Sequence, residues 1–220
     1  MDDRKFVPIA KWVRFSIING FAAVISYLSA AFIPLPEMLV LLLAFLFGLF
    51  FMMSTLGMFF IIRSWRVSIQ LYAGTVFNLV ATAFVVLMLV VQQTGFAFHE
   101  SFETQSKTGV TDEQLKWMFK EVNSVQLGID ITWDIFVSAG TFLLALSLYG
   151  HPVYKKIFTY TGVLFSLLLF TFNFYYFPEP PADAGSIDFG PFVSAWYLSL
   201  TIVTLIKRRK LVAIANAGTG

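Results

Sequence analysis

Long runs of apolar residues alternate along this chain with short polar segments, and the lengths of these runs predict the fold. A helix of about 20 mostly apolar residues is long enough to cross the roughly 30 Å hydrocarbon core of a bilayer. Six runs reach or approach this length, at approximately 15–33, 38–62, 67–91, 129–149, 157–177 and 189–206. We therefore expect six transmembrane helices within a single integral membrane domain, residues 1–220.

The runs favour helices over membrane-spanning strands. Each run is continuously apolar, whereas the strands of a membrane barrel are about 10 residues long and alternate in polarity. The composition agrees, because the chain is 58% hydrophobic and only 13% charged, a balance that a water-soluble domain of this length cannot bury. The predicted fold class is all-α: a polytopic, six-helix transmembrane bundle embedded in the lipid bilayer.

Lysine and arginine residues gather on one side of the predicted membrane. Twelve of the 15 lie in the amino terminus, the second and fourth connecting loops and the carboxyl terminus, and the others are Lys107, Lys116 and Lys120. Cations near the ends of spans resist translocation and stay in the cytoplasm. We therefore expect both termini to be cytoplasmic and the chain to lie in the plasma (inner) membrane. The run Lys207 to Lys210 could also attract anionic lipid headgroups.

Two loops are expected on the outer side, at 92–128 and 178–188, and the second carries three prolines. In the first loop, Thr111 and Gln114 have the spacing of a capping box, which marks the start of a helix. Apolar residues then recur every three or four positions, which indicates one apolar helix face: Leu115, Met118, Phe119, Val122, Val125 and Ile129. This amphipathic helix either lies on the outer membrane surface or extends the fourth span outward, with Gly128 as a hinge.

The fourth span contains the candidate site. Asp130 and Asp134 lie four residues apart and share one helix face with Ser138. A carboxylate within the bilayer costs about 3 kcal/mol on insertion scales unless it is neutralised, hydrated or paired. Asn173, near the outer end of the fifth span, is expected at a comparable depth. Either these groups form a proton or cation site in a cavity open to the outside, or the acids hydrate the start of the span within the headgroup region.

Small and polar residues also repeat at helical spacing in the other spans. Such residues are enriched where membrane helices face one another, so we expect these faces to point into the bundle. They either provide close packing or line a path for a solute. The residues are Ala22, Ser26 and Ala30; Gly74, Asn78 and Thr82; Thr159, Gly162 and Ser166; and Ser194, Tyr197, Thr201 and Thr204.

Several chemistries can be excluded from the sequence. The chain has no cysteine and only two histidines, His99 and His151, so it forms no disulfide or thiolate metal site. The two histidines are expected on opposite sides of the membrane and cannot share a haem. No nucleotide-binding motif occurs, and we expect no cofactor and no nucleic-acid partner. One alternative remains at the outer side, where His99, Glu100 and Glu103 could contribute to a site for a hard cation with Asp130.

Three functional hypotheses follow. The first is a small transporter or channel-like protein that uses Asp134, with Asp130, Asn173 and Ser138, as a proton or cation site. The second is an accessory or assembly subunit that binds another membrane protein, or a second copy of itself, through the outer helix. Its contact residues would be Leu115, Trp117, Phe119 and Val122. The third is a lipid-modifying membrane enzyme, although no catalytic residue identifies one.

Overall fold

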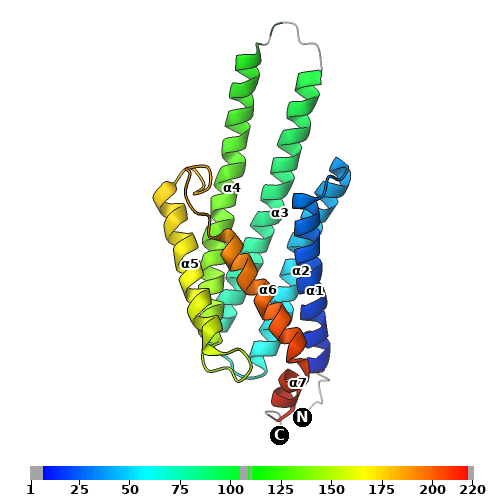
Figure 1. Ribbon diagram of the computed structural model, residues 1–220, viewed down its shortest axis with the longest axis vertical. Coiled ribbons are helices and arrows are strands. Elements are labelled where there is room, and N and C mark those ends of the chain that lie inside the picture. Colours follow the sequence, from blue (N-terminus) through cyan, green and yellow to red (C-terminus); the bar gives the residue numbers. More distant parts are fainter. Residues whose placement is uncertain (1–6, 105–108, 110, 218–220) are drawn as a thin grey trace, which may run out of the picture.

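The computed structural model describes residues 7–104, 109 and 111–217, with the backbone alone at 101–104. These residues form seven α-helices and no strand (Figure 1). The helices are α1 (Ile9–Phe32), α2 (Glu37–Arg63), α3 (Ile69–Thr104), α4 (Asp112–Ser147), α5 (Lys156–Tyr176), α6 (Gly190–Ile206) and α7 (Arg208–Ala217). The predicted all-helical fold is confirmed for this part of the chain.

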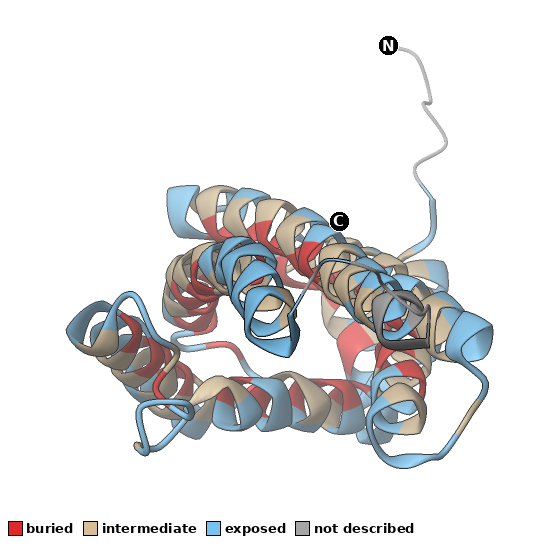
Figure 2. Ribbon diagram, turned by 90° about the horizontal axis from the view of Figure 1, so that it is seen from above, coloured by how far each residue is buried: buried red, intermediate tan, exposed pale blue. Residues whose placement is uncertain are grey.

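Helices α1 to α6 form a ring in chain order. Each helix packs against the next, and α6 closes the ring by packing against α1 (Figure 2). The short helix α7 contacts both α1 and α6. We call the end of the ring where α3 and α4 project the hairpin end, and the end where α1 begins and α7 lies the terminal end (Figure 1).

Five helices, α1 to α5, are each long and apolar enough to cross a membrane. Helix α6 has 17 residues and reaches the required length only together with α7, from which it is bent by 75°. The structure thus contains five to six potential spans among the described residues. The turn at Lys207 directs the basic residues of α7 away from the axis of α6.

The predicted outer segment at 92–128 is mostly helical, and its helical part is longer than the sequence indicated. Helix α3 continues past Val91 to Thr104, and α4 begins at Asp112 and runs through Gly128 without a break. Lower hydropathy ends an apolar run but not a helix, and residues 92–104 contain no proline. At 36 residues each, both helices are about 54 Å long, so they project well beyond a hydrocarbon layer of roughly 30 Å.

The start of α4 confirms the predicted capping box. The amide of Gln114 donates to the Thr111 hydroxyl oxygen at 3.2 Å, and the Thr111 amide donates to Gln114 Oε1 at 2.9 Å. Of the two placements expected for the amphipathic helix, the structure shows an outward extension of the fourth predicted span. The expected hinge at Gly128 is absent, since α4 is continuous there.

Two further differences concern the ends of the chain. Helix α1 begins at Ile9, six residues before the predicted span. Helix α7 was not predicted, because its basic first turn carries no capping signal at Lys207. It is stabilised instead by burial of Leu211 and Ala215, which lie four residues apart on the face that packs against the bundle.

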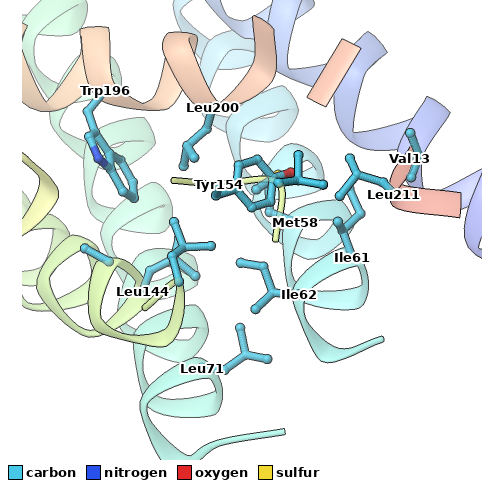
Figure 3. Close-up of a cluster of buried hydrophobic side chains, with 13 residues drawn as sticks. Val13, Met58, Ile61, Ile62, Leu71, Leu144, Tyr154, Trp196, Leu200 and Leu211 are labelled. Carbon is cyan, nitrogen blue, oxygen red and sulfur yellow. The ribbon is translucent and has the colours of Figure 1, made fainter. Parts of the chain in front are cut away.

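An apolar core fills the terminal end of the ring. We call it the terminal cluster, and its largest members include Ile61 and Ile62 from α2, Leu144 from α4, Trp196 and Leu200 from α6, and Tyr154 (Figure 3). Tyr154 belongs to the turn between α4 and α5 and is fully buried. This turn therefore reaches into the ring and helps to close its terminal end.

The small and polar stripes mostly face the interior, as predicted. Buried positions include Ser26, Gly74, Asn78, Thr82, Thr159, Gly162, Ser166, Thr201 and Thr204. The prediction is wrong for Ser194, which is exposed. Its neighbour Val193 takes the interior position instead and packs in a second apolar cluster with Ala81, Val137 and Leu169.

Candidate functional site

Asp134 and Asn173 meet inside the bundle at the contact between α4 and α5. Asn173 Nδ2 donates a 2.9 Å hydrogen bond to Asp134 Oδ2 and a second, at 3.0 Å, to the backbone oxygen of Leu169. Asp134 is 7% exposed and Asn173 is 1% exposed. The two residues that were expected at the same depth are therefore direct partners, and the partner of the carboxylate is a neutral amide.

Several polar atoms around this pair have no hydrogen-bond partner. They are the second carboxylate oxygen Asp134 Oδ1, the amide oxygen Asn173 Oδ1, the Ser138 hydroxyl and the indole nitrogen of Trp133. Buried polar atoms are almost always satisfied by protein or by ordered water. Three oxygens and one N–H group in one region therefore make a place where a water molecule, a proton or a small cation can bind.

Asp130 lies one helical turn from Asp134 toward the hairpin end and is half-buried. The connection between α5 and α6 brings Asp183 and Asp188 within electrostatic range of it. Asp188 also accepts a 2.7 Å hydrogen bond from the Gly190 amide through Oδ1, which holds it at the start of α6. Three other carboxylates, Asp130, Asp183 and Asp188, therefore lie on the hairpin side of Asp134, and such a field concentrates cations.

The sequence did not single out Asp183 and Asp188 for this site, because they lie in a proline-rich connector. Their contribution depends on where that connector folds back over the ring. The only signal available in the sequence was the acidity of the connector itself.

A second group of polar side chains lies further along α4, toward the terminal end. Thr141 Oγ1 and the Tyr197 hydroxyl are 3.0 Å apart and hydrogen-bonded. Asn78 on α3 is fully buried and approaches the same Tyr197 hydroxyl, although neither of its amide atoms makes a hydrogen bond of good geometry with the described residues. These residues connect α3, α4 and α6 across the interior of the ring.

The polar face of α4 changes to an apolar one toward the terminal end. Asp134, Ser138 and Thr141 share one face, and Ala145 and Leu148 continue it, both fully buried. Beyond them, the Tyr154 hydroxyl and Thr204 Oγ1 are 2.7 Å apart and hydrogen-bonded. Along this face of α4, polar side chains therefore give way to apolar ones toward the terminal end.

His151 lies in the turn at the terminal end, outside the long helices. Its Nδ1 atom accepts hydrogen bonds from the backbone amides of Val153 at 3.1 Å and Tyr154 at 3.3 Å, and its ring packs against Trp65. Burial lowers the pKa of His151 to about 4, because desolvation penalises the imidazolium form. His151 is therefore neutral at pH 7 and acts as a structural acceptor.

The alternative metal site at the outer side gains no support from the described residues. Within the described ranges, no group of three or more histidine or acidic side chains is placed to hold a metal ion. The Glu103 side chain lies outside the described part. His99 and His151 lie at opposite ends of the molecule, one on the projecting part of α3 and the other at the terminal end, so the exclusion of a shared haem stands.

The proposed partner-binding residues fall into two sets on the projecting hairpin. Leu115, Phe119 and Val122 line an apolar groove of about 340 Å³ between α3 and α4. In it, the Phe119 ring packs against His99 with the ring centroids 4.4 Å apart. Trp117 is outside the groove lining and is 61% exposed, so the four residues do not form one contact surface.

Comparisons with protein-family models, curated proteins and solved structures found no match for this chain.

Proposed function

We propose that this chain is a small membrane transporter or channel-like protein in which Asp134 carries a proton or a cation. The observation that supports the proposal is a buried carboxylate whose described partner is a neutral amide, with its second oxygen unpartnered. Ionisable residues at such positions commonly mark ion or proton pathways. Asn173 orients the carboxylate, Ser138 supplies a further oxygen, and Asp130 attracts the cation toward the site.

The division of the interior favours transport over a purely structural role. Carboxylates of Asp130 and Asp188 lie near Asp134 on the hairpin side, whereas the terminal cluster fills the other end of the ring. A solute-binding site that is accessible from one side at a time is a requirement of alternating access. We infer that the site is reached from the hairpin end.

The proposal includes six spans in the plasma (inner) membrane, with both termini in the cytoplasm. The described cations support it, because Arg63, Arg66, Lys155, Lys156 and the α7 residues belong to the terminal end. The chain has no native cysteine, so single cysteines report topology directly. A cysteine at Arg209 should react with a membrane-impermeant maleimide only after the cells are opened, and a cysteine at Glu113 should react in intact cells.

The decisive test of the function is the substitution Asp134→Asn in reconstituted vesicles. The variant keeps the size of the side chain and one acceptor oxygen for Asn173, but it can neither ionise nor exchange a carboxyl proton. Proton flux, followed with a pH-sensitive dye, and monovalent cation flux should both be measured. We expect loss of the flux that the wild-type protein supports, with unchanged yield and elution volume. Glu113→Gln, an exposed neutralisation on the same helix, is the matched control, and equal flux in wild type and Asp134→Asn would reject the role.

A second candidate function is supported by the projecting hairpin, whose exposed apolar residues include Phe98, Trp117 and Met118. Exposed apolar surface of this kind often marks contact with another protein or with lipid. The chain would then be an accessory or assembly subunit. Purification in mild detergent separates the two candidates, since a stoichiometric membrane-protein partner that is lost in Trp117→Ala favours the subunit role.

A further inference from the structure

The polar group around Asn78 has properties that close helix packing does not explain. Asn78 is fully buried, and its amide lies beside the Tyr197 hydroxyl, but neither amide atom makes a hydrogen bond of good geometry with the described residues. Leaving a buried polar group unsatisfied costs about 1–3 kcal/mol. A leucine has nearly the same shape and would avoid this cost, so an asparagine that serves packing alone is unfavourable here.

Polar side chains from α4 and α6 lie close to Asn78. A Cβ atom added at Gly140 would meet the Asn78 side chain and its backbone nitrogen, so Asn78 lies directly against the backbone of α4. The Tyr197 hydroxyl lies beside it and is hydrogen-bonded to Thr141. Ser138, whose hydroxyl is also unpartnered, stands between Thr141 and Asp134 on the same helix face.

We propose that Asn78, Ser138, Thr141 and Tyr197 form a second, uncharged site that holds water and carries protons onward from Asp134. This inference rests on the proposed function and specifies its substrate as the proton. The site offers an amide and three hydroxyl groups, all of which can both donate and accept hydrogen bonds. Thr141 is seven residues from Asp134, which corresponds to about 10 Å along the helix.

The proton transfer is balanced at every step. Asp134 releases its proton to a water beside Ser138, so that one O–H bond breaks and one forms. Each hydroxyl or water that then passes a proton on receives another from the preceding group and returns to its original state. The path ends at the apolar layer of Ala145, Leu148 and Leu200, all almost fully buried. Passage beyond that layer requires a rearrangement of the terminal end.

Radiolytic footprinting tests directly whether the site holds water. X-ray pulses convert bound water into hydroxyl radicals, which oxidise the side chains beside it, and mass spectrometry locates the products. We expect oxidation of Tyr197 and a several-fold decrease in Asn78→Leu. Tyr154 is an internal control, since it is also a tyrosine inside the ring but belongs to the terminal cluster, and it should remain unlabelled. Absence of oxidation at Tyr197 in the wild-type protein would overturn the proposal.

Flux measurements separate this proposal from the function on which it rests. Asn78→Leu and Tyr197→Phe should each lower proton flux by about a hundredfold, the lower limit for a positioned proton-transfer group. Tyr197→Phe removes only a hydroxyl group. A decrease in flux in this variant is therefore not explained by misfolding, which could affect Asn78→Leu. If Asp134→Asn abolishes flux while both variants retain it, the second site is rejected and the role of Asp134 stands. If Asp134→Asn retains flux, the proposed function fails.

Discussion

Asn173 on α5 binds Asp134 on α4 through a single 2.9 Å hydrogen bond from Nδ2 to Oδ2, and the same Nδ2 group also bonds to Leu169 within its own helix. The amide is thus oriented by its own helix before it meets the carboxylate. One oxygen of each side chain is left unpartnered. The contact therefore both joins two helices and presents two acceptor oxygens to the interior.

Replacing Asn173 with leucine should destabilise the protein by about 1–3 kcal/mol, because the hydrogen bond to Asp134 Oδ2 is lost and that buried oxygen is left unsatisfied. The free energy of unfolding can be measured by denaturation in mixed micelles. Asn19→Leu is the control, since that amide bonds only to the backbone oxygen of Phe15 in the same helix. The double variant Asp134→Leu, Asn173→Leu should be more stable than Asn173→Leu alone, and strict additivity of the two changes would show that the residues are not coupled.

Gly57→Ala should separate α1 from α2. A Cβ atom at Gly57 would lie 2.8 Å from Ser16 Cα and 2.9 Å from its backbone nitrogen, and backbone cannot move aside as a side chain can. The reciprocal hydrogen bonds between Ser16 and Ser54 would be strained as well. We expect a loss of about 1–3 kcal/mol, the usual cost of overpacking.

Gly128→Ala is the matched control for this substitution. It also lies within a helix, but nothing stands within 4 Å of the added Cβ atom. Alanine there should stabilise the protein by about 0.5–1 kcal/mol, because glycine loses more conformational freedom on folding. Equal thermal stability of the two variants would contradict the close approach at Gly57.

The buried neutral His151 should make stability depend on pH. Its pKa is about 4 in the folded protein, against 6.5 as the ordinary value, so the unfolded chain binds a proton at higher pH than the folded one. The stabilisation is complete above about pH 6.5 and decreases as the pH falls toward 4. The melting temperature of the wild-type protein should therefore fall more between pH 7.5 and pH 5 than that of His151→Gln. Parallel curves would show that His151 is already solvated.

Tyr154→Phe should loosen the terminal end. It removes the 2.7 Å hydrogen bond to Thr204 Oγ1 without leaving a cavity, so the expected loss is about 1 kcal/mol. Tyr160→Phe on α5 changes an exposed hydroxyl and should leave the unfolding free energy unaltered. Equal stability of the two variants would indicate that the Tyr154 hydroxyl contributes nothing to the closure of the ring.

The sequence predicted the helices well but not their ends. The apolar runs located α2, α5 and α6 to within two residues, because in those helices proline, glycine or clustered charge follows the apolar run. Helix α3 was placed too short, since the segment after Val91 is polar enough to leave the hydrocarbon but retains good helix formers. The length of the segment that crosses the hydrocarbon and the length of the whole helix are different quantities. Hydropathy reports only the first.

The candidate site was predicted in part. Helical spacing places Asp134 beside Ser138, and equal depth suggested Asn173 as a partner, which the hydrogen bond confirms. The group of Asn78, Thr141 and Tyr197 could not be derived as a unit, because it depends on which helices are neighbours. Spacing along one helix shows which residues share a face, but not which face of another helix stands opposite.

The closed ring of α1 to α6 has a consequence for how the molecule forms. Because neighbours in space are also neighbours in the chain, each newly synthesised helix meets a partner that already exists. Such local connectivity favours rapid assembly. The last step, when α6 and α7 meet α1, joins the most distant segments, so the two ends of the polypeptide complete the structure together.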